Sequence, residues 1–320
     1  MTPSLDNRIR AIEQRVASAH GLTITEHPLP QRDSRVRVLS VGAGSPLIYL
    51  NGITAPALGF APLLAELPGY RHILMEFPGQ GLAPAPQWTG PSLREFAVAT
   101  LTGTLDALGL PKATVIANSL GGLCTLWTAL DAPGRISRAV LIGAPATALP
   151  GARPVPAMVS LTTPLRGRME QSLMGLPSPR FLADAALSEA LGEQAVAAMS
   201  DDLVDLHRLP LRRPGQAAAY RFLLTRLLDG RTPRPENILT PIDLSRLDLP
   251  LLFVWGRDDV ILSPTDALPS IEHIPSAHLE EVPGGHNPWF DAPAACATPI
   301  HSFVTAGCRA ESDPAPHPLP

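Results

Sequence analysis

The sequence predicts an α/β protein in which a mostly parallel central sheet is flanked by helices and carries an inserted helical cap. Short, almost continuous apolar runs recur along the chain, as in strands that are buried on both faces. Helix-like segments lie between these runs, which is the order of βαβ units. The alternation is interrupted once, by the helix-like residues 147–245. A length of 320 residues suits one large catalytic domain with such an insertion.

The first expected elements are a helix and an edge strand. Residues 6–20 predict a short amphipathic helix from the helical spacing of Ile9, Ile12, Val16 and Ala19. We therefore assign residues 1–34 to an N-terminal helical extension. Residues 35–41 largely alternate between polar and apolar side chains and run into Gly42-Ala43-Gly44, which indicates a half-buried strand of an edge hairpin.

Six further apolar runs are the expected strands of the core. They cover residues 47–50, 72–75, 114–117, 139–142, 251–254 and 279–282, and the last is the most polar, as a weak edge strand would be. Helices are expected at 92–108 and 120–130. The core is thus assigned to residues 35–146 and 246–308, and the cap to 147–245. Residues 309–320 contain four prolines and predict a disordered tail.

Charge and composition argue against several classes of partner. The net charge is -4 and only 17% of residues are charged, so no basic stripe is available for nucleic acid. We expect no membrane span, since no apolar run approaches ~18 residues. Met1–Arg10 does not have the composition of a signal peptide, which predicts a cytoplasmic protein. Cys124, Cys296 and Cys308 have no zinc-type spacing and are interpreted as free thiols.

A candidate nucleophile lies where one predicted strand ends and a helix begins. The segment Ala117-Asn118-Ser119-Leu120-Gly121-Gly122 has small residues on both sides of Ser119. A serine on a sharp turn between strand and helix projects its hydroxyl above the edge of the sheet, and the small neighbours allow the backbones to come close. Ala117 occupies the place of the usual first glycine of such an elbow.

Two further polar residues follow later strands in the order that a catalytic triad requires. Asp259 comes after the strand 251–254 in Gly256-Arg257-Asp258-Asp259, and His286 comes after 279–282 in Pro283-Gly284-Gly285-His286. The chain order Ser, Asp, His is that of nucleophile-elbow hydrolases. Such a carboxylate orients the imidazole, which then takes the proton of the serine hydroxyl.

These motifs together resemble the α/β-hydrolase superfamily, over about residues 35–150 and 245–305. The resemblance implies Ser119 as nucleophile, His286 as base and Asp259 as the acid, with Asp258 a solvated turn residue. The other acid position that some relatives use, after strand 139–142, holds Gly143-Ala144-Pro145 instead, which strengthens the assignment of Asp259.

The same resemblance predicts an oxyanion hole from the backbone amides of Leu120 and Ile53. Asn51-Gly52 stands where the family usually has His-Gly. Glu76-Phe77-Pro78-Gly79-Gln80-Gly81 is similar to the family's Asp-x-Pro-Gly-His-Gly turn, with two substitutions. Both departures indicate an unusual subfamily.

The residues expected to contact substrate come from the loops of the core and from the cap. They are Asn51, Gly52, Asn118, Trp289, Met158, Met174 and Phe222. Methionine adapts to irregular apolar ligands, so a small apolar substrate is expected. The cap also contains several arginines that could bind an acidic substrate, but a solvated helical face is the favoured interpretation for Arg208, Arg212, Arg213, Arg221 and Arg226.

The predicted activity is hydrolysis of an ester or lactone through an acyl-enzyme, a mechanism that requires no metal or organic cofactor. Asn118-Ser119-Leu120-Gly121-Gly122 is also similar to the elbow of hydrolases that cleave C–C bonds in ring-cleavage products. His286-Asn287-Pro288-Trp289 resembles peptidase-like and perhydrolase-like relatives, which leaves amide cleavage and cofactor-free peroxidation open. A biosynthetic cyclase or acyltransferase on the same triad stays open too, as does a non-catalytic receptor of this fold. The sequence leaves the oligomeric state open.

Overall fold

The computed structural model describes residues 4–29, 35–86 and 92–312. Within them an eight-stranded sheet has the order β1-β2-β4-β3-β5-β6-β9-β10. The strands are β1 (Thr23–Pro28), β2 (Arg35–Val41), β3 (Pro46–Leu50), β4 (Arg71–Glu76), β5 (Ala113–Asn118), β6 (Ile136–Ile142), β9 (Leu251–Gly256) and β10 (Ala277–Val282). β2 pairs antiparallel with β1 and β4, and all other pairs are parallel. The predicted α/β fold with a mostly parallel sheet is confirmed.

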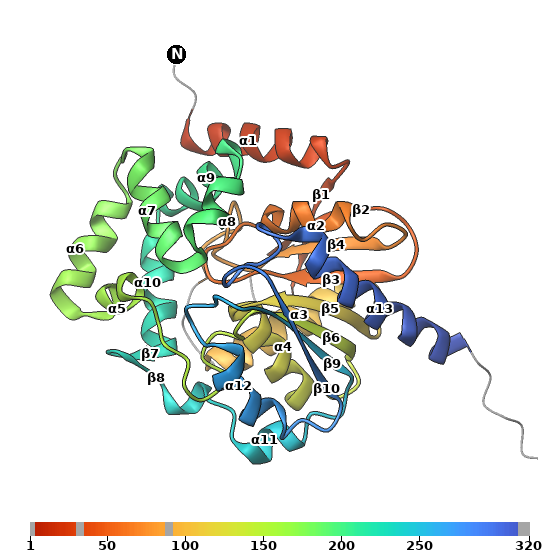
Figure 1. Ribbon diagram of the computed structural model, residues 1–320. Helices are drawn as coiled ribbons and strands as arrows, with labels where there is room; N and C mark the ends of the chain where they lie inside the picture. The colour runs from red at the N-terminus through yellow and green to blue at the C-terminus, as the bar shows by residue number, and fades with distance from the viewer. Residues whose placement is uncertain (1–3, 30–34, 87–91, 313–320) are drawn as a thin grey trace, which may run out of the picture.

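Helices cover both faces of the sheet, because alternate residues of the buried strands point to opposite sides. Ile48 and Val115 belong to a core with α3 (Leu93–Ala107), α4 (Leu120–Asp131) and α12 (Pro264–Ile271). Tyr49 and Ile116 belong to the core on the other face, with α1 (Leu5–Ala19), α2 (Ala61–Ala65) and α13 (Pro293–Ser312). Figure 1 shows the resulting layers. Burial on both faces explains why these strands have almost continuous apolar sequences.

The chain between β6 and β9 is mostly helical and contributes no strand to the large sheet. It contains α5 (Pro156–Thr162), α6 (Pro164–Met174), α7 (Arg180–Leu191), α8 (Glu193–Ala198), α9 (Asp201–Arg208), α10 (Gln216–Leu227) and α11 (Pro241–Ser245). A two-stranded ribbon of β7 (Leu228–Asp229) and β8 (Thr232–Pro233) follows α10. Figure 1 shows α5–α10, in green to cyan, gathered at one side of the sheet. We call α5–α10 the inserted helices.

Two expectations at the ends of the chain need correction. Residues 23–28, assigned to a helical extension, form β1 on the edge of the sheet and pair with β2. This strand is mostly exposed, so it lacks the apolar run by which buried strands are recognised. α13 continues to Ser312, so residues 309–312 of the expected tail are helical. The rest of that tail, 313–320, lies outside the described residues.

Helix α1 joins the sheet to the inserted helices. Its Glu13 accepts hydrogen bonds from the guanidinium of Arg37 on β2 at 2.7 and 2.9 Å, and Arg37 also contacts Glu76 at the end of β4. On its other side, α1 forms ion pairs with α9, between Arg8 and Asp205 and between Arg15 and Asp202. The helix therefore positions α9 relative to the core.

Candidate active site

Ser119 occupies a strained turn between β5 and α4. Its φ of 51° and ψ of -118° lie outside the regions that side-chain-bearing residues prefer, and such a conformation costs roughly 1 to 3 kcal/mol. The side chain does not cap α4 although the residue is at its N-cap position. The turn thus presents the hydroxyl away from the helix, as the predicted elbow requires.

The small residues around Ser119 are required by close backbone contacts. A Cβ atom on Gly121 would lie 2.3 Å from the carbonyl oxygen of Leu50, and one on Gly52 would lie 3.1 Å from Cβ of Ser119. These glycines let α4 and the loop after β3 approach the elbow. Ala117 is completely buried in strand β5, where its methyl group is accommodated in the core.

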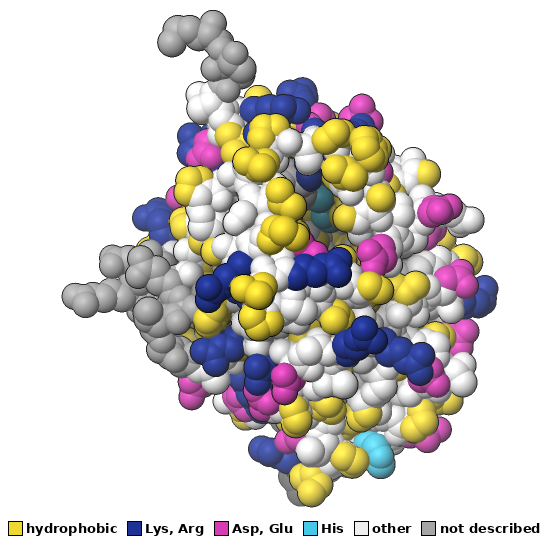
Figure 2. All heavy atoms as spheres, turned by 90° about the vertical axis from the view of Figure 1, so that its left-hand side faces the viewer, with side chains coloured by type: hydrophobic (Ala, Val, Ile, Leu, Met, Phe, Trp, Pro, Cys, Tyr) yellow, Lys and Arg dark blue, Asp and Glu magenta, His cyan; other side chains and the backbone are white. Residues whose placement is uncertain are grey.

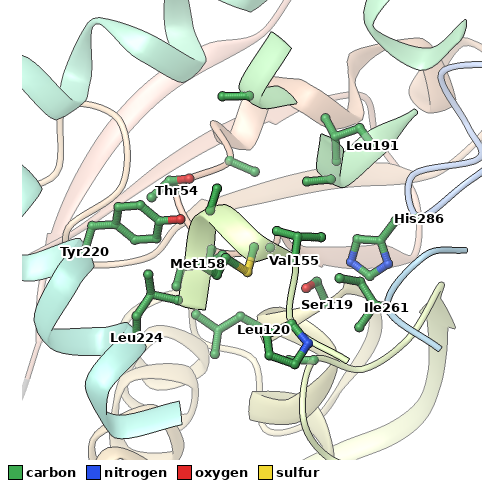
Figure 3. A pocket seen from close by; sticks show the side chains of 18 of the residues that line it. Thr54, Ser119, Leu120, Val155, Met158, Leu191, Tyr220, Leu224, Ile261 and His286 are labelled. Atoms are coloured by element: carbon green, nitrogen blue, oxygen red, sulfur yellow. The ribbon is translucent and has the colours of Figure 1, made fainter. Parts of the chain in front are cut away.

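His286 is held by Asp259 in the orientation that a general base needs. Its Nδ1 lies 3.0 and 2.9 Å from the two carboxylate oxygens of Asp259. Both side chains are buried. Since Nδ1–H donates to the carboxylate, Nε2 is left as the proton acceptor. Figure 3 shows the His286 ring and the Ser119 hydroxyl next to each other at one end of the cavity.

The carboxylate of Asp259 is itself fixed by the backbone. The amides of Ala144 and Ile261 each donate to one of its oxygens at 2.9 Å. Asp258, by contrast, is exposed. At the other acid position, Gly143 has a φ of +68°, and a Cβ there would lie 2.5 Å from the carbonyl oxygen of His286. A side chain cannot be placed there without moving the histidine, so the geometry supports Asp259 as the acid.

The loop after β3 is fixed by two amide side chains, Asn51 and Gln80. Asn51 donates to the carbonyl of Pro56 and accepts from the amide of Gly52, both at 2.8 Å. Gln80 donates to the carbonyl of Gly52 at 2.6 Å and accepts from the amide of Phe77 at 3.1 Å. The two departures from the family pattern therefore act together on one loop, which carries Ile53. The Gly52 amide is occupied by Asn51, which favours the Ile53 amide as the oxyanion donor.

A cavity of about 230 Å³ opens beside Ser119 and is lined mostly by apolar side chains. The core contributes Gly52, Ile53 and His286 from loops, Asn118 from the end of β5 and Leu120 from the start of α4. Its remaining wall comes largely from the inserted helices, as Figure 3 shows for Met158, Tyr220 and Leu224. Concave, mostly apolar cavities with a few polar groups at one end are the usual form of small-molecule sites.

Four of the seven residues expected to contact substrate line this cavity, namely Gly52, Asn118, Met158 and Met174. Asn118 also donates to the carbonyls of Ile142 and His286, at 2.8 and 3.2 Å, so it ties the elbow to the histidine loop.

The other three do not line it, which corrects those expectations. Asn51 points into its own loop. Trp289 is completely buried, donates to the carbonyl of Gly59 at 2.8 Å and stacks on Phe60. Phe222 lies on another side of α10 from Tyr220 and Leu224, beneath the guanidinium of Arg226.

Sequence reasoning missed several residues of the cavity, above all Tyr220 and His207, and it favoured a solvated face for Arg208, which lines the cavity. Burial raises the pKa of the Tyr220 hydroxyl, so it stays a hydrogen-bond donor, and Figure 3 shows it pointing into the cavity. Burial lowers the pKa of His207 to about 4, so this ring is neutral near pH 7. Arg208 is bound to Asp205 and to the carbonyl of Ser178, at 2.7 and 3.0 Å. The sequence offered one signal for Tyr220, because its spacing of four residues from Leu224 places both side chains on one face of a helix.

Neither a metal site nor a membrane span is found in residues 4–29, 35–86 and 92–312. No group of histidine, cysteine and carboxylate side chains in this part of the chain could hold a metal ion. No helix there is both long and apolar enough to cross a bilayer. Cys124 and Cys296 are free and buried, and burial raises the pKa of each thiol to about 12, so both are poor nucleophiles.

Known proteins share this fold and part of this sequence. The model of the alpha/beta hydrolase family matches residues 47–298. A 2-hydroxy-6-oxononadienedioate/2-hydroxy-6-oxononatrienedioate hydrolase from Paraburkholderia phymatum is 27% identical over 252 residues, which cover 77% of this chain and 82% of that protein.

Solved structures of similar shape include two kinds of hydrolase. Naproxen esterase from Bacillus subtilis has a TM-score of 0.71 at 19% identity, covering 95% of this chain and 99% of that one. A meta-cleavage product hydrolase from Pseudomonas fluorescens has a TM-score of 0.70 at 20% identity, covering 88% and 98%. At sequence identities of 19% and 20%, the structural similarity shows a shared fold and nothing more.

Proposed function

Because this chain belongs to the alpha/beta hydrolase family, we propose that it is a serine hydrolase that cleaves an ester or lactone of an apolar small molecule. One observation carries the proposal. Ser119, on its strained elbow, lies at the end of an apolar cavity beside His286, and Asp259 holds the Nδ1 side of that histidine. This is the arrangement that activates a hydroxyl for attack on a carbonyl.

The first half of the reaction forms an acyl-enzyme. Nε2 of His286 takes the proton of the Ser119 hydroxyl as Oγ attacks the carbonyl carbon. The negative charge that develops on the carbonyl oxygen is directed at the amides of Leu120 and Ile53. His286, now protonated on both nitrogens, is stabilised by Asp259. It then gives its proton to the departing alkoxide as the ester C–O bond breaks.

Water completes the reaction on the same groups. His286 takes a proton from a water molecule, the resulting nucleophile attacks the acyl carbon, and the bond to Ser119 breaks as the serine recovers its proton. Two backbone amides and the histidine all donate hydrogen bonds to Asp259, which hold its carboxylate in place in both halves of the reaction.

The lining of the cavity supports an apolar substrate. Met158, Leu161 and Leu224 line it on the side of the inserted helices, and the cavity volume of about 230 Å³ suits a small acyl or alcohol group. Removal of such a group from water is favourable by about 25 cal/mol per Å² of apolar surface. The inserted helices therefore act as a cap that selects substrates, while the triad determines the reaction.

The second candidate is cleavage of a C–C bond in a ring-cleavage product, because several curated relatives are named as 2-hydroxy-6-oxononadienedioate hydrolases. Those names describe substrates with two carboxylates. Arg208 is the one lysine or arginine among the described residues that line the cavity, and it is already bound to Asp205 and the Ser178 carbonyl. An anionic substrate would have to compete with Asp205 and the Ser178 carbonyl for the guanidinium of Arg208. This observation favours the ester or lactone.

A substrate panel tests the choice. We expect the purified protein to hydrolyse apolar aryl esters or lactones with kcat/KM at least about tenfold above that for a 2-hydroxy-6-oxo-dienedioate and for matched amides. The Ser119→Ala variant is the control for background hydrolysis. Faster turnover of the dienedioate would establish the C–C hydrolase instead. Labelling by a fluorophosphonate with no turnover of any ester or lactone would count against the proposed activity.

A further inference from the structure

Six large apolar side chains are exposed together on α6, on the loop that follows it and at the start of α7. Their exposed fractions are 85% for Leu165, 59% for Met169, 55% for Leu173, 55% for Leu176, 66% for Phe181 and 51% for Leu182. We call them the α6–α7 patch. The other exposed large apolar residues of the described chain, Ile242, Val260 and Leu268, lie in three separate elements or loops. Clustering of this kind marks an interaction surface.

The spacing of the patch makes α6 apolar on two opposite sides. Leu165, Met169 and Leu173 are each one turn apart, so they form a stripe along the exposed side of the helix. On the inner side, Met174 lines the cavity, and a Cβ on Gly167 would lie 2.2 Å from the carbonyl oxygen of Leu161. A helix that only covered the cavity would carry polar residues toward water. The outer stripe therefore needs another explanation.

The charges around the patch identify the type of surface that would meet it. Arg166 and Arg168 lie on either side of the stripe, and Arg168 is exposed and forms no ion pair with any described residue. Arg180 is paired with Asp184 and Asp201, so Arg168 carries the uncompensated positive charge beside the stripe, in a chain whose net charge is -4. The carboxylate of Glu170 is bound to Arg166 and to the Ser160 hydroxyl, at 2.8 and 2.6 Å. An apolar stripe beside an unpaired arginine is complementary to the acyl chains and headgroups of anionic lipid.

We propose that the α6–α7 patch docks this protein on an anionic phospholipid surface, with α6 lying in the plane of the interface. The proposal goes beyond the hydrolase activity and does not depend on it. Docking would place a helix that contributes Met174 to the cavity wall against the membrane in which apolar molecules accumulate. A second copy of the chain fits less well, because Glu170, the carboxylate of α6, is already bound to Arg166 and leaves Arg168 no anionic partner in a stripe-to-stripe contact. Figure 2 shows this side of the molecule, with yellow apolar and dark blue basic side chains interspersed on it.

Flotation of the Ser119→Ala protein with vesicles tests the proposal without any catalytic readout. The vesicles are phosphatidylcholine alone or with about one third phosphatidylglycerol. We expect binding to the anionic vesicles, weaker binding in high salt, and a partition coefficient at least about tenfold lower for Leu165→Ser/Leu173→Ser. The matched control is Ile242→Ser, a residue of α11 that is 72% exposed and outside the patch, which should bind like the parent.

A charge variant and a measurement of mass distinguish the remaining outcomes. Arg168→Glu should bind anionic vesicles less than the parent and neutral vesicles equally. Equal binding of the parent and Leu165→Ser/Leu173→Ser to anionic vesicles would overturn the proposal, as would no binding of the parent. A dimer in sedimentation velocity that dissociates in Leu165→Ser/Leu173→Ser would assign the patch to a second copy and would also overturn it. Circular dichroism checks that each variant is folded.

Discussion

At the scale of single residues, the candidate site depends on side chains that hold other groups in place. Asp259 receives hydrogen bonds from His286 and from the amides of Ala144 and Ile261. Asn51 and Gln80 fix the loop that carries Ile53. None of these side chains needs to touch the substrate. In the proposed mechanism they hold the base and the oxyanion donors in a geometry that is ready before the substrate arrives.

Asp259→Asn should reduce kcat by about 10³- to 10⁴-fold, since the amide no longer stabilises the imidazolium or selects its tautomer. The matched control is Asp258→Asn, which changes an exposed neighbour and should stay within about twofold of the parent. Both variants are compared by ester turnover at equal protein concentration. Equal losses in the two variants would contradict the assignment of the acid.

Asn51→Ala should lower kcat by about ten- to a hundredfold with a smaller change in KM, because a loose loop misplaces the Ile53 amide in the transition state. Gln80→Ala should act in the same way. The double variant should lose less than the product of the two effects, since both side chains fix one loop. A raised KM with unchanged kcat for Asn51→Ala would show instead that Asn51 binds substrate.

At the scale of elements, the elbow between β5 and α4 depends on a close contact of α4 with the end of β3. Gly121→Ala would bring a methyl group to 2.3 Å from the carbonyl oxygen of Leu50, which is backbone and cannot move aside. We expect a loss of about 1 to 3 kcal/mol in the free energy of unfolding, measured by urea denaturation. Gly175→Ala is the control, since its nearest contact is 3.4 Å and it should be nearly neutral. If Gly121→Ala and Gly175→Ala are equally stable, the contact between Gly121 and Leu50 is less tight than the distance of 2.3 Å indicates.

The elements differ in how far the sequence could predict them. Strands such as β5 and β9 are buried on both faces, so their apolar runs were sufficient. β1 was missed because an exposed edge strand needs few apolar residues and is defined by pairing with β2, which the local sequence does not contain. Within the cavity, Met158 and Met174 were found from their residue type. Tyr220 was missed in favour of Phe222, since that choice depends on the side of α10 that faces the cavity.

At the scale of the whole molecule, α1 connects the sheet and the inserted helices through charges, which are buried on the side of the sheet and more exposed on the side of α9. Glu13 and Glu76 share the guanidinium of Arg37, and all three side chains are buried. Burial raises the pKa of Glu76, Arg37 opposes this, and the nearby Glu13 adds to it. The sequence placed Glu76 in a family turn but could not show that Arg37 and Glu13 meet it, since the contact depends on the fold.

The pH dependence of stability follows from the sign of that shift. A carboxyl whose pKa is raised on folding binds its proton more tightly in the folded state, so it stabilises the fold at low pH and loses this contribution as pH rises through the raised value. The free energy of unfolding of Glu76→Gln, taken relative to that of the parent, should therefore be about 1 to 3 kcal/mol higher at pH 8 than at pH 5. Urea denaturation at both pH values measures the gain. If Glu76→Gln and the parent differ by the same free energy of unfolding at both pH values, the raised pKa is contradicted. The control is Glu66→Gln, which changes an exposed glutamate.

The role of Ser119 is the central claim, and the turnover of Ser119→Ala tests it most directly. The measurement is kcat/KM of purified Ser119→Ala and parent protein for one ester that the parent hydrolyses, with matching circular dichroism. Ser119 lines the cavity and its alanine variant keeps the backbone of the elbow, so the fold should survive. We predict a loss of about 10⁴-fold or more, because base and acid cannot act without the nucleophile. Turnover within tenfold of the parent would contradict the account.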